Sequence, residues 1–206
     1  MLGDLEPRTP VAQIVDSTKP NKLAHVVLRT KNLDAMTRWY LTVLNARLAL
    51  GTPAISFLAF DEEHHRIAIA QVDTTTARDP NQPGMDHIAF TYAGLGELLK
   101  TYQRLRGEDI LPRWCINHGV TTSLYYVDPD GNRVELQIDN FATEEELQYF
   151  FENDPEFIKN PLGAPFEPDR LINDYDAGVP MSQLLKVPPY PPGLSPADVR
   201  KDMGFP

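Results

Sequence analysis

The chain has 206 residues, of which 42% are hydrophobic and 23% charged, and its formal net charge is −10. This composition is typical of a globular protein with a substantial core, and the acidic balance argues against nucleic acid as a partner. No run approaches the ~20 apolar residues that a membrane-spanning helix needs, so we expect no membrane association. A single cysteine, Cys115, excludes an internal disulfide, and the first residues lack the pattern of a signal peptide. Both features predict a cytoplasmic protein.

Charge and proline are distributed unevenly along the chain. Residues 141–206 hold 12 acidic and 5 basic side chains, a net −7, which leaves −3 for residues 1–140. The same stretch holds 11 of the 19 prolines. We therefore predict a compact domain over residues 1–140 and a proline-rich, irregular extension over residues 141–206 that packs on this domain.

An internal repeat begins near residue 22. His25 lies in the apolar segment LAHVVL and His87 in MDHIAF, and the two histidines are 62 positions apart (87 − 25). Apolar residues with helical spacing follow at the same offset, over residues 32–44 and 95–105. Each half of the repeat thus starts with a short strand that carries one histidine, followed by a helix.

The second part of each half matches at an offset of 67. Residues 61–73 read DEEHHRIAIAQVD, and residues 128–139 read DPDGNRVELQID. Both segments open with a polar turn and continue into an alternating strand. In this alignment Ala68 corresponds to Glu135 (135 − 67).

Together these matches predict an α+β fold of two tandem βαβββ modules, over about residues 22–73 and 84–140. A single module would leave one sheet face uncovered, and two modules related by a pseudo-twofold axis would close into a cup-shaped sheet. Equivalent first strands would then face each other and bring His25 and His87 together inside the cup.

Three side chains at equivalent inward positions of this cup can bind a metal: His25, His87 and Glu135, here called the triad. Two histidines and one carboxylate are the ligand set of mononuclear non-haem Fe(II) oxygenases. The fourth equivalent position holds Ala68, so an octahedral ion would keep about three open positions for substrate and dioxygen. The alternatives are hydrogen-bonded core histidines and a solvent-facing carboxylate, while a structural zinc site normally has four protein ligands.

Three segments, GMDHIAF, HHRIAIA and HGVTTSLYYVDPDGNRVELQ, resemble the type I extradiol ring-cleaving dioxygenases of the vicinal-oxygen-chelate superfamily. The resemblance covers about residues 22–140. The YxxDPxGNxxEL pattern is common to the whole superfamily, glyoxalases and antibiotic-resistance proteins included, whereas the paired histidines before IAIA and the HGxTxSxY stretch are more particular to the dioxygenases. This chain has one pair of modules, where the best-known members of the family have two.

The resemblance implies a catalytic apparatus. The triad matches the family's iron ligands, and His65 matches its active-site acid–base histidine. Tyr125 stands at the place of its substrate-binding tyrosine, and His118 resembles a further pocket histidine, although it lies closer to the tyrosine than usual. The implied cofactor is Fe(II), with Mn(II) as an alternative, and the co-substrate is dioxygen. The implied reaction is ring cleavage of a catechol-type, 2,3-dihydroxybiphenyl-like diol.

Other functions share this fold. A glyoxalase- or epimerase-like lyase or isomerase would normally use a fourth protein ligand, which Ala68 cannot supply. A metal-free small-molecule-binding protein would need neither the triad nor His65. We also expect a homo-oligomer, a dimer or larger. The extension, which includes a predicted helix over residues 143–153, would wrap the domain, narrow the mouth of the cup or form a subunit contact.

Overall fold

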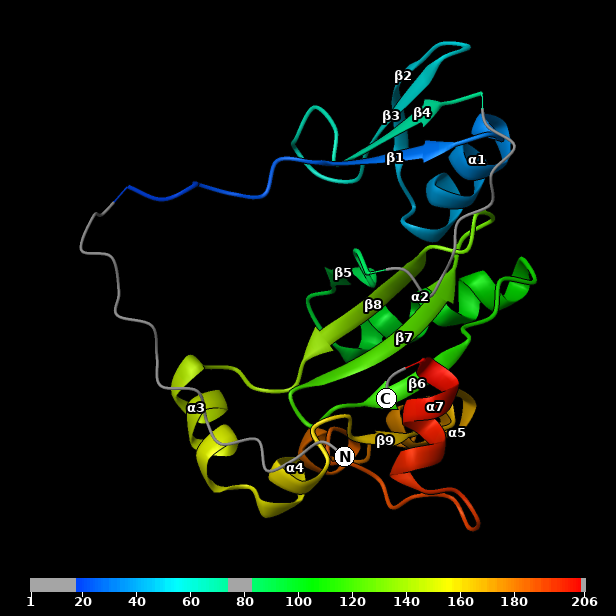
Figure 1. The fold of residues 1–206 in the computed structure, drawn as a ribbon. Helices are drawn as coiled ribbons and strands as arrows, with labels where there is room; N and C mark the ends of the chain where they lie inside the picture. Colours follow the sequence, from blue (N-terminus) through cyan, green and yellow to red (C-terminus); the bar gives the residue numbers. More distant parts are fainter. Residues whose placement is uncertain (1–17, 74–82, 205–206) are drawn as a thin grey trace.

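The computed structural model describes residues 18–73 and 83–204, and each predicted module has the expected order of one strand, one helix and three strands (Figure 1). Module 1 consists of β1 (Val26–Thr30), α1 (Leu33–Val43), β2 (Arg47–Gly51), β3 (Ile55–Ala59) and β4 (Ile67–Gln71). Module 2 consists of β5 (His87–Thr91), α2 (Leu95–Gly107), β6 (Trp114–Asn117), β7 (Thr121–Val127) and β8 (Arg133–Asp139). The α+β class and the tandem βαβββ modules are therefore confirmed.

Local sequence explains where the helix of module 1 starts and which side it buries. The side chain of Asn32 accepts a hydrogen bond from the backbone N–H of Ala35, which caps the first turn of α1. The helix buries Met36, Tyr40 and Val43, whose spacing of three and four residues places them on one face. This face packs against the sheet of module 1 and fixes which strand side chains belong to the core.

The strand registers show that the modules are repeats of each other. In module 1 the order is β1-β4-β3-β2, with β1 parallel to β4 and Val27 opposite Ala68. In module 2 the order begins β5-β8-β7-β6, with β5 parallel to β8 and Ala89 opposite Glu135. The offsets are 62 (89 − 27) and 67 (135 − 68), the two values found in the sequence. Ala68 and Glu135 are thus structurally equivalent.

The helix-facing sides of both sheets contribute to one hydrophobic core, with α1 and α2 in contact. A buried hydrogen bond from the Tyr40 hydroxyl to Asp128 (3.0 Å) links the modules, and Arg104 donates to the carbonyl of Val43 (3.1 Å). Because neighbouring strand residues point to opposite faces, the other face of each sheet points away from this core. These two outward faces, called the open faces here, are the ones that carry the histidines at the starts of β1 and β5.

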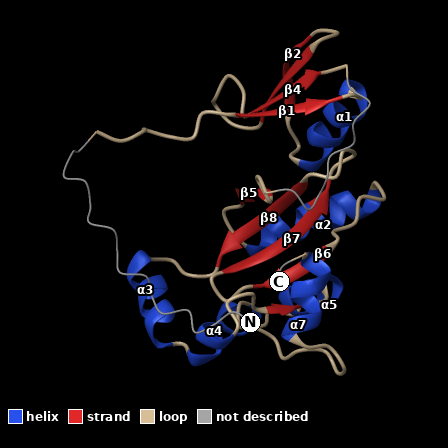
Figure 2. Cartoon of the chain, in the orientation of Figure 1, coloured by secondary structure: helices blue, strands red, loops and turns tan. Residues whose placement is uncertain are grey.

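The extension contains more regular structure than its proline content suggests. It consists of α3 (Glu144–Asn153), α4 (Pro155–Lys159), β9 (Ala164–Pro165), α5 (Pro168–Asp176), α6 (Met181–Leu184) and α7 (Pro196–Met203). Three of these helices begin at a proline, because the first helical position needs no N–H donor. The expectation of an irregular extension is therefore wrong for much of this segment (Figure 2).

The extension is attached to module 2. Strand β9 pairs antiparallel with β6, so that Pro165 lies opposite Ile116 and Ala164 opposite Asn117. Helix α5 contacts α2, which packs on the helix-facing side of the module 2 sheet. None of the helices in the described part of the chain is long and apolar enough to cross a membrane.

Candidate metal centre

Two of the three predicted ligands are in contact on the open face of module 2. Nε2 of His87, the first residue of β5, lies 3.0 Å from Oε2 of Glu135 in the middle of β8. The Glu135 carboxylate is almost fully buried, with 6% of its side chain exposed, whereas 32% of the His87 side chain is exposed. A buried carboxylate is unfavourable unless charge or hydrogen bonds compensate for its lost hydration. This position therefore favours a cation.

The pKa values of the two residues show how strongly they interact. The hydrogen bond to Glu135 raises the pKa of His87 to about 9; burial opposes this shift, and Asp86 adds to it. Burial would raise the pKa of Glu135, but its side-chain hydrogen bonds, the largest of them with His87, outweigh burial and hold that pKa below its usual value. Glu135 is thus an anion at neutral pH, as a metal ligand has to be.

A second carboxylate orients His87 from the other side of the ring. Nδ1 of His87 lies 2.8 Å from Oδ2 of Asp86, and the other oxygen of Asp86 accepts a hydrogen bond from Arg133 (2.9 Å). Metal-binding histidines usually donate their second ring N–H to a carboxylate or carbonyl in this way, which fixes the tautomer that leaves Nε2 for the ion.

Tyr125 and His118 lie beside this pair. The ring of Tyr125 packs edge-on against that of His87, with 5.6 Å between centroids. The Tyr125 hydroxyl is 2.9 Å from Nε2 of His118, and burial is the main cause that raises the Tyr125 pKa. The tyrosine is therefore a neutral hydrogen-bonding group next to the ligands.

The extension sets the tautomer of His118. Nδ1 of His118 lies 2.7 Å from the carbonyl oxygen of Leu162, an acceptor only, so this nitrogen carries the proton. Burial lowers the pKa of His118, which favours the neutral ring. Nε2 of the neutral ring is then an acceptor, and the Tyr125 hydroxyl donates to it.

A glycine permits this close approach of the extension. Gly163 has φ +75°, and a Cβ at this position would lie 1.9 Å from the carbonyl oxygen of Asn117. The hydroxyl of Tyr190 donates to the Gly163 carbonyl at 2.5 Å, and the side chain of Asn160 donates to the same carbonyl at 2.7 Å. The segment that fixes His118 is therefore itself held in place.

His25 and His65 lie together on module 1. Their ring centroids are 4.5 Å apart, and the His65 ring stacks on Phe57, with 4.5 Å between centroids and 21° between planes. Nδ1 of His65 is 2.5 Å from Nδ1 of the exposed His64. Burial is the main cause that lowers the pKa of His65, followed by the neighbouring charges of His64 and His25.

The chain does not assemble the whole triad. Among the residues that the structure describes, no group of three or more histidine, cysteine or acidic side chains is arranged to hold an ion. The expected meeting of His25 with His87 inside one chain is thus not seen, because the modules share a core on their helix sides. The donor chemistry of His87 and Glu135, with Asp86 behind the imidazole, nevertheless fits a divalent metal.

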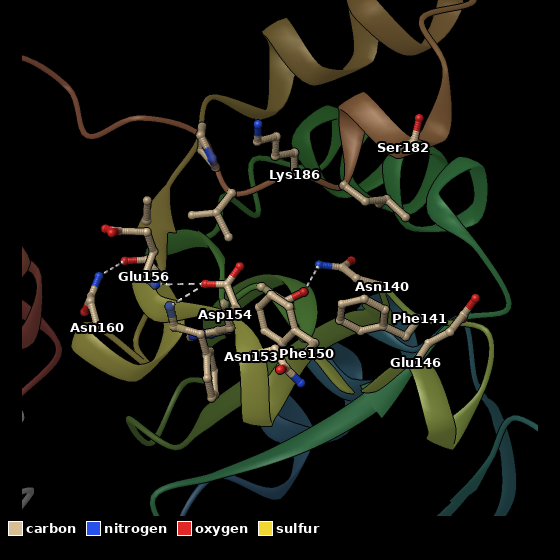
Figure 3. A pocket seen from close by; sticks show the side chains of 18 of the residues that line it. Asn140, Phe141, Glu146, Phe150, Asn153, Asp154, Glu156, Asn160, Ser182 and Lys186 are labelled. Atoms are coloured by element: carbon tan, nitrogen blue, oxygen red, sulfur yellow. Dashed lines mark hydrogen bonds between the residues drawn. The ribbon is translucent and has the colours of Figure 1, made fainter. Parts of the chain in front are cut away.

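A large cleft borders this site at His118 (Figure 3). It has a volume of about 1620 Å³ and lies between the β6–β7 turn, α3, α4 and residues 181–190. Aromatic rings form much of its wall, and those of Phe141 and Phe150 are 5.0 Å apart. Phe150 also packs against Gly119, where a Cβ would come within 2.7 Å of the ring. The extension thus forms an aromatic surface next to a candidate catalytic histidine.

Three contributors to the site were missed from the sequence. Asp86 precedes His87 directly, and Ser123 shares a strand face with Tyr125, so both could have been found from spacing alone. The carbonyl of Leu162 could not, because a backbone contact from a distant segment leaves no signal in the side-chain pattern.

Known proteins match most of this chain. The model of the Glyoxalase/Bleomycin resistance protein/Dioxygenase superfamily matches residues 22–136. Biphenyl-2,3-diol 1,2-dioxygenase 2 of Rhodococcus globerulus is 46% identical over 81% of this chain and 88% of its own length. Biphenyl-2,3-diol 1,2-dioxygenase 3 of the same organism is 48% identical over 79% of this chain and 86% of its own length.

Among solved structures, lactoylglutathione lyase from Agrobacterium tumefaciens superimposes with a TM-score of 0.49 and 21% identity. The match covers 59% of this chain and 96% of that one. The family model extends over both modules, and the alignments with the two dioxygenase relatives, which are 168 and 165 residues long, also reach into the extension. The chain therefore belongs to the glyoxalase/bleomycin resistance protein/dioxygenase superfamily.

Proposed function

We propose that this protein is an extradiol dioxygenase that cleaves the aromatic ring of a 2,3-dihydroxybiphenyl-like diol. The observation that carries the proposal is the buried contact between His87 and Glu135, with Tyr125 and His118 beside it. The names of the two relatives, which are nearly half identical to this chain, support the same reaction. Both atoms of dioxygen enter the product as the ring bond next to the two hydroxyls breaks.

We assign the metal to the triad, with Fe(II) as the natural ion and Mn(II) as the alternative for the same ligands. When bound, Fe(II) would hold both diol oxygens and dioxygen and pass electrons between them. Glu135 supplies negative charge from a buried position, and His87 supplies a nitrogen whose orientation Asp86 fixes. Ala68, at the position equivalent to Glu135, leaves room for the substrates.

The remaining roles concern protons. The neutral His118 has an acceptor nitrogen toward Tyr125, so the pair can take a proton from a diol hydroxyl and hold it nearby. The Tyr125 oxygen, whose proton faces His118, accepts a hydrogen bond from a diol hydroxyl and orients the diol. His65, whose pKa is lowered, is an unprotonated base that receives and returns a proton on the dioxygen side. These three residues are the catalytic residues of the proposal.

The aromatic cleft supports a substrate with more than one ring. A catechol alone would leave this apolar surface unused, whereas a second ring attached to the diol can reach past His118 toward Phe150. Burial of an aromatic ring is favourable at about 25 cal/mol per Å² of apolar surface. We therefore expect the two-ring diol to have a kcat/KM about 10-fold or more above that of catechol.

A single assay tests the function. Protein loaded anaerobically with Fe(II) is mixed with 2,3-dihydroxybiphenyl, and dioxygen uptake is measured together with the yellow ring-opened product. We expect one dioxygen consumed per diol cleaved, and the same assay after Mn(II) loading identifies the preferred ion. If the protein binds one iron per site but takes up no dioxygen with any diol, the proposal is contradicted and a lyase or isomerase function is favoured.

Two neighbouring tyrosines provide a matched pair of variants. Tyr125→Phe removes the hydroxyl at the site, and we expect kcat/KM to fall about 10- to 100-fold. Tyr126→Phe removes a buried hydroxyl on the opposite strand face, which has no hydrogen-bond partner among the described residues. The second variant should keep wild-type kinetics, and equal losses in both variants would refute the role of Tyr125.

A further inference from the structure

The carboxylate behind His87 is itself held by an arginine. Asp86 comes just before β5, 45% of its side chain is exposed, and one of its oxygens accepts a hydrogen bond from Arg133 (2.9 Å). Arg133 begins β8 and lies opposite His87 in the parallel strand pair, on the same strand face as Glu135. Because an arginine side chain is long and flexible, an exposed ion pair of this kind fixes a geometry only where other groups restrain the guanidinium.

Trp114 and the C-terminal end of α7 supply this restraint. Trp114 lies on the same open face, two strands away on β6, and the guanidinium carbon of Arg133 is over its ring, 5.0 Å from the centroid. The face of an indole attracts a cation more strongly than the other aromatic rings do. A Cβ added at Gly204, the C-cap of α7, would lie 3.3 Å from a guanidinium nitrogen, and a helix C-terminus also favours a cation. Only 23% of the Arg133 side chain is therefore exposed.

The extension fixes Trp114 in turn. Its Nε1 donates a hydrogen bond to Oδ2 of Asp202 in α7, at 2.5 Å. Helix α7 buries Val199 and Met203, which are one turn apart, in a small cluster that also contains Tyr125. The helix therefore lies on the open face of module 2, over its outer strand β6 (Figure 1).

We propose that Trp114 is a positioning residue for the metal ligand His87. It acts through Arg133, which keeps Asp86 in place behind the imidazole, and α7 anchors it. The inference rests on the metal centre proposed above, to which it adds a residue that acts only through its neighbours. The contacts form one connected path from the C-terminal helix to the ligand, in which each group is bonded to the next or stacked on it.

A role of Trp114 in packing alone makes a different prediction. If the indole only filled space between the sheet and α7, its loss would lower the free energy of unfolding without changing how the folded protein binds an ion. If it positions His87, its loss weakens the binding of the ion, because a metal-binding histidine depends on the groups that hold its ring.

Titration with Mn(II) measures this binding without any turnover. The metal-free full-length protein is titrated, and electron paramagnetic resonance counts the free ion. We expect Trp114→Leu to raise the Kd for Mn(II) about 10-fold, the loss typical when a group behind a metal ligand is removed. Trp114→Phe keeps an aromatic face for Arg133 and should raise the Kd only about 3-fold. An unchanged Kd in Trp114→Leu overturns the inference.

The second tryptophan of the chain provides the matched control. Trp39 is half-buried like Trp114, but it lies on α1 and packs against the hydrophobic core beside Tyr40. Trp39→Leu removes the same ring, and we expect urea unfolding to show a lower stability while the Kd for Mn(II) stays at the wild-type value. An equal rise of the Kd in both leucine variants would indicate general destabilisation and overturn the inference.

A surface variant tests the anchor without disturbing the core. The side chain of Asp202 is 54% exposed, so Asp202→Ala should fold even if Trp114→Leu does not. It removes the acceptor of the indole N–H, and we expect a rise in Kd of about 3-fold. A Kd equal to that of the wild type would remove α7 from the path.

A double-mutant cycle tests the path itself. If Trp114 acts only through Asp86, then Asp86→Ala already loses what the tryptophan contributes. Adding Trp114→Leu should then change the Kd by less than about 2-fold. Losses that multiply in the double variant would show that the two residues act independently, which overturns the inference.

The outcomes separate the inference from the function that it presupposes. An unchanged Kd in Trp114→Leu leaves the proposed function standing. Wild-type protein that binds neither Mn(II) nor Fe(II) contradicts the proposed metal centre and the inference together. Wild-type protein that binds the ion but takes up no dioxygen contradicts the proposed reaction alone, because the Kd values concern the ion and not the diol.

Discussion

Modules 1 and 2 have the same strand order and register, but they differ at two places. At the position of Glu135 in module 2, module 1 has Ala68. At the outer edge of module 2, β9 of the extension pairs with β6, whereas all five residues of the equivalent strand β2 in module 1 are exposed. Because of these two differences, the carboxylate of the proposed site and the segment that orders His118 belong to module 2 and its extension. Module 1 has neither.

The comparison indicates how a duplicated unit can acquire two different roles. Module 2 holds the contact between His87 and Glu135, the two proposed ligands, and the extension orders His118 from outside the repeat. Module 1 contributes imidazoles and a small residue, and its open face is apolar. In the proposed site, the difference between Ala68 and Glu135 leaves open positions in the ligand set.

The largest effect is expected when the difference at Ala68 is removed. Ala68→Glu restores the symmetry of the repeats and adds a fourth protein ligand, which leaves an octahedral ion about two open positions where the diol and dioxygen need three. We expect iron to remain bound while diol-dependent dioxygen uptake falls about 100-fold or more. Ala70→Glu adds the same charge two residues further along the same strand and should retain most of the activity. Equal activity in the wild type and Ala68→Glu would show that the open position is not needed.

A smaller effect is expected from separating the extension from module 2. Gly163→Ala forces a Cβ against the Asn117 carbonyl in a left-handed backbone, and should lower the free energy of unfolding by about 3 kcal/mol. The control is Gly178→Ala, where φ is +78° but no atom lies within 4 Å of the added Cβ, so a loss of about 1 kcal/mol is expected. Urea unfolding measures both values. If Gly163→Ala cost no more than its control, the tight contact beside His118 would be refuted.

The smallest effect concerns the link between the modules. Tyr40→Phe removes one of the hydrogen bonds to the buried Asp128, which retains bonds from the backbone of Asp130 and from Asn132. We expect the free energy of unfolding to fall by about 1–3 kcal/mol. Tyr126→Phe loses no bond and should be neutral, so a similar loss in both variants would assign the effect to packing.

Much of the fold could be predicted from the sequence because local patterns determine it. The helical spacing of residues 32–44 and 95–105 predicted both helices, and the alternating segments 61–73 and 128–139 contain strands β4 and β8. Strand β6 begins only at Trp114, although α2 ends at Gly107. Asp109 has φ +58° as the chain leaves α2, and Pro112 follows, so the intervening backbone is not extended.

The site was only partly predictable. The contact between His87 and Glu135 follows from the alternation of side chains within one sheet, and this alternation can be recognised in the sequence repeat. The position of His25 relative to them depends on how whole modules pack, and that packing involves many weak contacts spread over the core. The role of Leu162 lies in a backbone carbonyl, for which any residue type would serve.

The contact between Gly163 and the β6–β7 turn changes what counts as the smallest functional unit for protein engineering. The charge and proline content place a domain boundary near residue 140, which suggests that the chain can be shortened there or that the following segment can be replaced. Such a product could retain every residue of the triad and both βαβββ modules. It would lose the carbonyl that sets the tautomer of His118, so recombination between relatives should exchange module 2 and its extension as one block.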